Sequence, residues 1–126
     1  MGKEIRSYRD LEVWKKSMHL VLDVYRCTRS FPKEELYGLV LQIRRCAVSI
    51  PSNIAEGYGR YGTGEFVRFL QIATGSLCEL HTQVEIAQNL HYLSDSLYEH
   101  LSVISGEIER MLNSLIRKLQ EKRDSE

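Results

Sequence analysis

Hydrophobic residues recur at helical spacing along almost the whole chain. Between residues 39 and 54 they are separated by four, four, three and four positions, which places them on one side of a helix. This predicted core stripe consists of Leu39, Ile43, Ala47, Ile50 and Ile54. Similar stripes run from about residue 8 to 29, from 64 to 89 and from 95 to 120, and no segment alternates with the period of a strand. The pattern therefore predicts an all-α protein whose four helices pack as a bundle.

Residues with special backbone or capping properties mark the ends of these helices. Ser7 is followed three positions later by Asp10, a spacing typical of a capping box at a helix start. A glycine-rich stretch over residues 57–64 ends the second helix, because glycine accepts the left-handed backbone of a helix C-terminus. We expect Thr63 and Ser94 to cap the third and fourth helices.

Pro51 lies inside the predicted second helix. It lacks a backbone N–H, and its ring crowds the carbonyl of Ala47, at a cost of about 3 kcal/mol. We expect a kink there, with Ser49, Ser52 or Asn53 forming hydrogen bonds to the freed backbone groups.

The first three helices also carry a second stripe opposite the predicted core stripe. On the first helix, the predicted core stripe is Leu11, Trp14, Met18, Leu22 and Tyr25. The fourth helix has a charged far side instead, and we expect that side to face solvent. Soluble monomers seldom expose large apolar patches, so we predict that the second stripes form subunit interfaces. The predicted interface residues are Val13, Leu20, Val24, Leu41, Val48, Ser52, Ile72, Gly75 and Glu79.

Length and composition indicate one domain over residues 1–126, with frayed ends at about residues 1–7 and 121–126. The N-terminus has no signal-like apolar stretch and no segment is long and apolar enough to span a membrane, so we expect a cytoplasmic protein. The three cysteines form no CxxC pair and are expected to remain reduced as small hydrophobic residues.

The formal net charge is zero, but the two halves of the chain differ. Residues 1–60 hold 11 basic and 7 acidic side chains, and residues 61–126 hold 6 and 10. The halves therefore carry +4 and −4. This distribution suits packing between complementary protomers at least as well as binding to a polyanion, which needs an accessible basic surface.

The sequence offers no candidate for catalysis, a metal or a cofactor. None of the four histidines stands three residues after a glutamate, as a di-iron bundle requires. Cys78, His81 and Glu85 share one helix face, but their position beside a core stripe favours boundary residues over metal ligands. The glycine-rich stretch follows a helix and lacks the Gly-Lys-Ser/Thr ending of a phosphate-binding loop. We therefore expect a protein that is not an enzyme.

Several segments resemble one known family, and together they cover nearly the whole chain. They are Arg-Asp-Leu-Glu-Val-Trp (9–14), Phe-Pro-Lys-Glu-Glu-Leu-Tyr-Gly-Leu (31–39), Gln-Ile-Arg-Arg (42–45), Ser-Ile-Pro-Ser-Asn-Ile-Ala-Glu-Gly (49–57) and Glu-Phe-Val-Arg-Phe-Leu (65–70). The sequence is similar to the four-helix-bundle proteins named after the intervening sequences of bacterial 23S ribosomal RNA, the S23 family. The resemblance implies an antiparallel up-down bundle, a ring-like homopentamer and no known catalytic activity. Similar proteins also serve as accessory factors beside the reverse transcriptase of diversity-generating retroelements, where the ring is thought to bind nucleic acid.

Several cationic and aromatic residues are candidates for nucleic-acid contact. They are Arg44, Arg45, Arg60, Arg68, Tyr58 and Tyr61. The arginines could instead pair with Glu56, Glu65 or Glu79 across protomers, and the zero net charge favours this structural role. The expected function is that of a non-enzymatic homo-oligomeric accessory or structural protein that binds RNA or a reverse transcriptase–RNA complex. The alternative is a protein-binding scaffold with no nucleic-acid role.

Overall fold

The computed structural model describes residues 4–125, and within this range it contains α- and 3-10 helices and no strand. The elements are η1 (Tyr8–Asp10), α1 (Glu12–Thr28), η2 (Lys33–Glu35), α2 (Leu39–Tyr58), α3 (Thr63–Asn89) and α4 (Asp95–Asp124). The prediction of an all-α fold with four long helices is confirmed. None of the helices in the described range combines the length and the apolar character that crossing a membrane would require.

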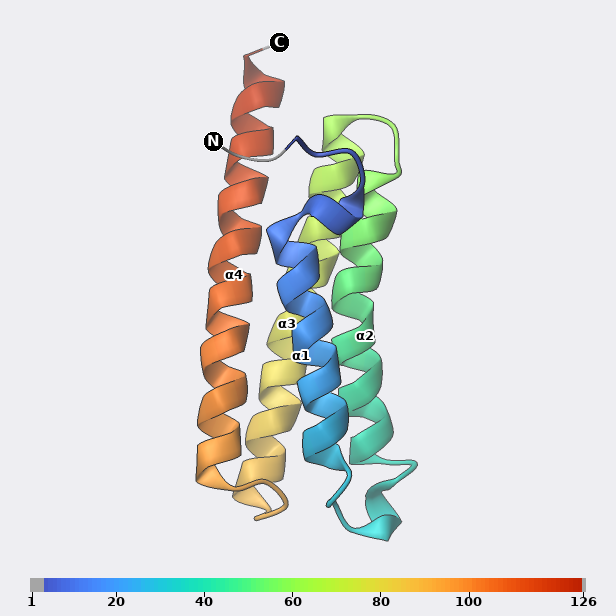
Figure 1. Ribbon diagram of the computed structural model, residues 1–126, viewed down its shortest axis with the longest axis vertical. Coiled ribbons are helices and arrows are strands. Elements are labelled where there is room, and N and C mark those ends of the chain that lie inside the picture. The colour runs from blue at the N-terminus through green and yellow to red at the C-terminus, as the bar shows by residue number, and fades with distance from the viewer. Residues whose placement is uncertain (1–3, 126) are drawn as a thin grey trace.

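The four helices pack side by side as a bundle (Figure 1). Helix α1 contacts α2 and α4, and α3 contacts the same two helices, so α1 and α3 lie diagonally across the bundle. The α1–α2 and α3–α4 connections lie at one end of the molecule and the α2–α3 connection at the other, so successive helices run in opposite directions (Figure 1). The most extensive contact is between α2 and α3.

Gly57 permits the close approach of α2 and α3. A Cβ atom at this position would lie 2.6 Å from Cβ of Phe69 and 3.2 Å from Cδ1 of Phe66. Both phenylalanines belong to the first turns of α3, so a larger residue at position 57 would push the two helices apart. The glycine near the end of α2 is therefore needed for packing. The helix is capped two residues later by Gly59, whose φ of −80° is right-handed, so the left-handed C-terminus that we predicted for this glycine-rich stretch is wrong.

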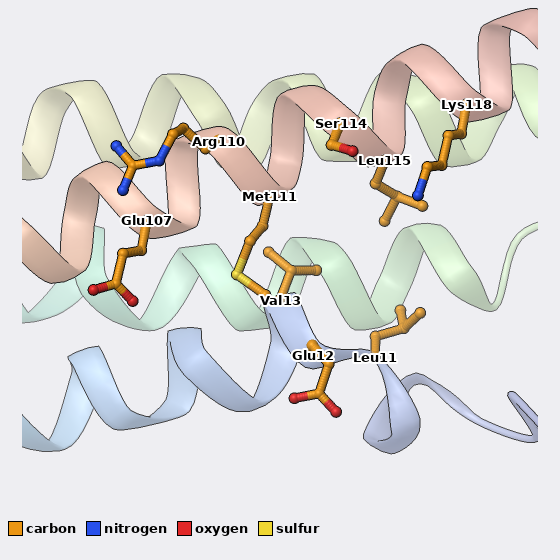
Figure 2. Close-up of a pocket in the computed structure, with 9 residues that line it drawn as sticks. All are labelled: Leu11, Glu12, Val13, Glu107, Arg110, Met111, Ser114, Leu115 and Lys118. Atoms are coloured by element: carbon orange, nitrogen blue, oxygen red, sulfur yellow. The ribbon is translucent and has the colours of Figure 1, made fainter. Parts of the chain in front are cut away.

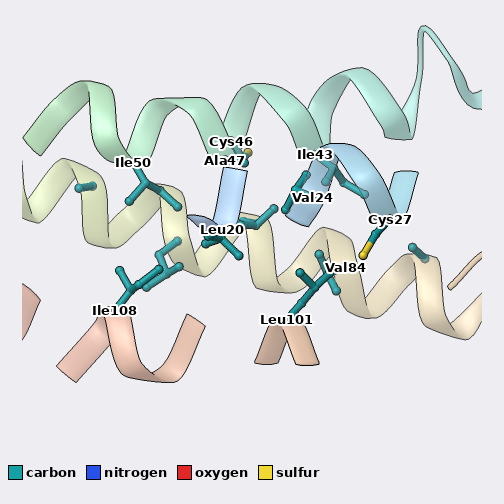
Figure 3. Close-up of a cluster of buried hydrophobic side chains, with 14 of the residues drawn as sticks. Leu20, Val24, Cys27, Ile43, Cys46, Ala47, Ile50, Val84, Leu101 and Ile108 are labelled. Atoms are coloured by element: carbon teal, nitrogen blue, oxygen red, sulfur yellow. The ribbon is translucent and has the colours of Figure 1, made fainter. Parts of the chain in front are cut away.

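The core is formed by aliphatic side chains from all four helices (Figure 3). Leu20 of α1, Ile50 of α2, Leu70 of α3 and Ile108 of α4 have no exposed surface. Burial of each such side chain contributes about 1.5–3 kcal/mol. On α2 the predicted stripe is confirmed, because Ile43, Ala47, Ile50 and Ile54 are all buried. On α3 and α4 apolar residues at helical spacing also face the core, among them Leu70, Leu77, Leu101 and Ile108.

Helix α1 turns a different face to the core from most of the one we predicted, although Leu11 and Trp14 of the predicted stripe are partly buried against the core. Three residues that we assigned to a subunit interface are buried within the subunit: Val13, Leu20 and Val24. Three residues that we assigned to the core are exposed at the surface: Met18, Leu22 and Tyr25. Both stripes are apolar, so periodicity did not distinguish them. Ser17 obscured the true core face, because it is fully buried and its hydroxyl donates to the carbonyl of Val13 at 2.7 Å.

Two of the three helix caps that we predicted from the sequence are present in the structure. Ser7 and Asp10 form the predicted capping box, although it caps η1, which precedes α1. Ser94 caps α4, with its Oγ accepting from the backbone N–H of Leu97 at 3.2 Å. Thr63 is not a cap, because α3 already begins there and Gly62, at φ +87°, holds the N-cap position.

Fraying of the chain ends stays a prediction. Residues 121–124 continue α4 to Asp124, and residues 4–7 precede η1. Residues 1–3 and 126, which belong to the same expectation, lie outside the described residues.

Helix α2 continues through Pro51 without interruption of its helical assignment. Ser49 Oγ donates to the carbonyl of Cys46 and Ser52 Oγ to that of Val48, both at 2.8 Å. Asn53 Nδ2 donates to the carbonyl of Ser49 at 2.7 Å. The predicted side chains thus bond to the helix backbone, but to carbonyls other than that of Ala47. A kink at Pro51 stays a prediction.

Candidate protein–protein interface

The outward side of α1 and α2 presents large apolar side chains to solvent. Met18, Leu22 and Tyr25 of α1 are 38%, 49% and 38% exposed, and Val48 of α2 is 41% exposed. They project from the side of each helix opposite the core. Both α1 and α2 have apolar residues on two sides, and the core buries only one of these sides. We call this surface, together with Arg45, the α1–α2 face.

Two shallow grooves run along this face. One has a volume of about 340 Å³ and is lined by Tyr8, Trp14, Met18, Val21, Val48, Pro51, Ser52 and Ala55. The other, of about 460 Å³, is lined by Tyr25, Leu41, Arg44, Arg45, Val48 and Ser49. Val48 lines both, so the grooves adjoin along the seam between α1 and α2. The α1–α2 face is thus recessed and mostly apolar, which suits a protruding partner helix.

The two adjacent arginines of α2 have different surroundings. Arg44 Nε donates to Thr28 Oγ1 at 3.0 Å, and the guanidinium lies 4.5 Å from the centre of the Tyr25 ring. Arg44 is therefore engaged in holding α2 against the end of α1. Arg45 is exposed and forms no ion pair with any residue between 4 and 125. It is consequently the cation of this face that remains available to a partner.

The outer side of α3 carries the second exposed stripe, as predicted. Ile72 and Ile86 are 41% and 44% exposed, and Gly75 and Glu79 are also exposed between them. A Cβ atom at Gly75 would meet no atom within 4 Å. Packing within the chain therefore does not explain this mid-helix glycine. We call Ile72, Gly75, Glu79 and Ile86 the α3 face.

The other candidate residues for nucleic-acid contact lie around the α2–α3 connection and the first turns of α3. Arg60 pairs with Glu56 at 2.7 Å and lies 5.1 Å from the centre of the Phe69 ring. Tyr61 is 99% exposed.

Two further members of this set have partners on α3. Arg68 pairs with Glu65 at 3.7 Å, and the Tyr58 ring packs edge-on against Phe66. The predicted partners Glu56 and Glu65 thus pair with arginines inside the chain, three or four residues apart on a helix. The structure places Arg44 and Arg45 on the α1–α2 face, so the four arginines do not form one patch.

A groove of about 540 Å³ that we did not predict lies between α1 and α4 (Figure 2). In the figure, Met111 and Leu115 of α4 point toward Val13 of α1 and toward Leu11, which immediately precedes that helix. The groove is lined by Leu11, Glu12, Val13, Glu107, Arg110, Met111, Ser114, Leu115 and Lys118. Lys16 forms an ion pair with Glu107 beside it. Its apolar residues have core periodicity, so only the relative placement of the two helices reveals the groove.

The three candidate metal ligands, Cys78, His81 and Glu85, do not line one common pocket. Cys78 and His81 line a small pocket between α3 and α4, but Glu85 accepts a hydrogen bond from the Tyr98 hydroxyl at 3.2 Å. Within the described part of the chain, no group of three His, Cys, Asp or Glu residues could hold a metal ion. Cys27 and Cys46 are buried free thiols. Burial raises the pKa of the Cys46 thiol to about 11, and a hydrogen bond to Glu79 acts in the same direction.

Fold and surface together define a small all-helical bundle with an exposed apolar face. The family profile of the 23S rRNA-intervening sequence protein matches residues 9–114, and the chain belongs to this family. Among solved structures, the chain is similar to a protein of unknown function from the S23 ribosomal protein family of Bacteroides thetaiotaomicron VPI-5482. The two share 25% sequence identity and a TM-score of 0.77, over 83% of this chain and 95% of the other. No curated protein matches the chain.

Proposed function

We propose that this protein is a non-enzymatic, homo-oligomeric assembly protein whose subunits associate through the α1–α2 face. The observation that carries the proposal is the group of exposed apolar side chains, Met18, Tyr25 and Val48, along a recessed seam, with Leu22 also exposed on α1. Leaving such a patch in water is unfavourable at about 25 cal/mol per Å² of apolar area. Association of subunits removes that cost, and the resemblance to ring-forming proteins suggests an assembly of about five chains.

The proposal is tested by placing a charge in the middle of the seam. Val48→Glu replaces an apolar side chain with a carboxylate where the two grooves adjoin, so a partner packed there would have to desolvate a charged group. We expect the variant to have the molar mass of a smaller species by size-exclusion chromatography with light scattering. Its helicity by circular dichroism should equal that of the wild type, because Val48 is 41% exposed in the folded chain.

Val103→Glu is the matched control for this experiment. Val103 is 50% exposed and lies on α4, away from the α1–α2 face. The control should retain the wild-type mass. A monomeric wild-type protein, or a Val48→Glu variant that keeps the full mass, would contradict association through the α1–α2 face.

We propose as a second function that the assembly binds RNA through the α2–α3 connection. The observation that favours this function is the exposure of Tyr61, which at 99% has a free ring face for stacking on a base. Arg60 stands beside it and is half exposed, so its guanidinium remains reachable by a phosphate despite its pair with Glu56. The alternative, a scaffold that binds only proteins, is supported by the zero net charge.

Titration with a structured RNA at several salt concentrations distinguishes RNA binding from a scaffold that binds only proteins. Phosphate contacts make affinity fall steeply with salt, and removing one contact lowers the salt slope by about 1. We expect Arg60→Ala to lower the slope in this way, and Tyr61→Ala to weaken binding with little change in slope. Arg117→Ala on the far side of α4 is the control and should bind as the wild type does. Absence of RNA binding by the wild-type assembly at low salt would favour the protein scaffold.

A further inference from the structure

We propose that the α1–α2 face of one chain binds the α3 face of a second copy, so that each subunit contact joins two different surfaces. This inference rests on the proposed self-association and specifies its partner. The occupant of the seam is the helix stripe formed by Ile72, Gly75, Glu79 and Ile86.

Charge is the first argument for this pairing. Arg45 on the α1–α2 face and Glu79 on the α3 face are both exposed, and neither has an ion-pair partner within residues 4–125. Glu79 accepts hydrogen bonds from the amide of Gln83 at 3.4 Å and from the thiol of Cys46. A symmetric contact of the α1–α2 face with itself would bring the arginines of two copies together, which is unfavourable.

The spacing of the two stripes is the second argument. On α2, Arg45, Val48 and Ser52 are separated by three and then four residues. On α3, reading toward the N-terminus, Glu79, Gly75 and Ile72 are separated by four and then three. At a rise of about 1.5 Å per residue, both stripes span about 10.5 Å when the helices are antiparallel. This register sets Arg45 against Glu79 and Ser52 against Ile72, and it places Val48 about 1.5 Å along the helix axis from Gly75.

Packing against a second copy explains the glycine at position 75, which packing within one chain does not. A mid-helix glycine costs about 1 kcal/mol relative to alanine, and no neighbour within the chain approaches it. Opposite Val48, the absent side chain leaves a depression into which the valine fits, as a knob enters a hole between packed helices. The α1–α2 face thus receives a stripe with a complementary shape.

The direction of the helices is consistent with a closed ring. Helices α2 and α3 run in opposite directions within one chain (Figure 1). Rotation about an axis parallel to the bundle preserves the direction of every helix, so α2 of one copy also lies antiparallel to α3 of the next. Contacts between two different surfaces propagate around such an axis and close when the rotation allows it.

Mixing two variants tests the pairing directly. Val48→Glu disables the α1–α2 face and leaves the α3 face intact, whereas Ile72→Glu does the reverse. We expect each variant alone to be monomeric by light scattering. A 1:1 mixture should form a dimer of about two chains, because one intact junction joins the two variants and both outer faces of the pair are disabled.

Each other outcome is informative. If Ile72→Glu alone keeps the wild-type mass while Val48→Glu does not, self-association through the α1–α2 face stands and the pairing with α3 is wrong. If both variants are monomeric and their mixture stays monomeric, the two faces are not partners. If both keep the wild-type mass, the proposed function fails as well.

A charge exchange tests the register and does not depend on the apolar variants. Arg45→Glu and Glu79→Arg should each weaken assembly about three- to tenfold, because each opposes like charges across the junction. The double variant in one chain should restore assembly, since every junction again joins opposite charges. Circular dichroism of each variant checks that the fold is retained. A double variant that is weaker than both single variants would overturn the register.

Discussion

At the scale of single residues, the buried thiol of Cys46 gives a prediction about pH. Burial, aided by the hydrogen bond to Glu79, raises the pKa of this thiol to about 11, from about 8.5 in an unfolded chain. Between these values the unfolded chain loses the proton first, so the free energy of unfolding falls as pH rises. The contribution is complete below about pH 8.5 and is lost by about pH 11.

Urea unfolding of the wild type and of Cys46→Ala from pH 7 to 11 measures this contribution. The pKa values of Cys27 and Tyr92 are also raised, and these groups remain in the variant, so the difference between the two curves isolates Cys46. We expect the wild type to lose more stability than the variant over this range. Equal losses of stability in the two proteins would show that the pKa of the Cys46 thiol is the same in the folded and the unfolded chain.

Residue-level predictions from sequence succeeded mostly where the determining contacts are local, although the equally local cap predicted at Thr63 was wrong because Gly62 holds that position. The capping box of Ser7 and Asp10 and the cap at Ser94 depend on atoms within four residues. The partners of Arg44 depend on how α1 and α2 lie together, because Thr28 is 16 positions away. For this reason the sequence marked Arg44 as a candidate for nucleic-acid contact, whereas its hydrogen bonds within the chain give it a structural role.

At the scale of helices, periodicity identified the elements but not always which side faces inward. Helix α1 has apolar residues on two sides, and the choice between them is made by α2 and α4, which pack against it. Helix α3 was predicted correctly because its second side is interrupted by Arg68, Gly75 and Glu79. The groove between α1 and α4 was missed because it arises from the separation of two helices, which has no periodic signal of its own.

The reversed face of α1 also changes the candidate interface without removing it. With Val13, Leu20 and Val24 inside the core, the exposed apolar stripe of α1 is the one that contains Met18, Leu22 and Tyr25. This stripe lies beside Val48 of α2, which was among the predicted interface residues. The expectation of two-sided helices therefore holds, while the residues that α1 contributes are different.

At the scale of the whole molecule, the opposite charges of the two halves of the chain support contacts between unlike surfaces. Residues 1–60, which contain α1 and α2, carry +4, and residues 61–126, which contain α3 and α4, carry −4. A chain with this asymmetry is neutral overall, yet it attracts a second copy when the basic half of one meets the acidic half of the next. Zero net charge is therefore compatible with a specific assembly.

Self-association also links the thermal stability of the protein to its concentration. Any partner that binds the folded chain and not the unfolded one raises the free energy of unfolding by mass action, and here the partner is the chain itself. We expect the temperature midpoint of unfolding to rise steadily as the protein concentration is increased about hundredfold. The Val48→Glu variant should unfold at a midpoint that does not depend on concentration, because its α1–α2 face is disabled. Scanning calorimetry or circular dichroism at several concentrations measures both. A concentration-independent midpoint for the wild type would contradict the coupling of folding to assembly, and an equal rise in both proteins would show that the association uses another surface.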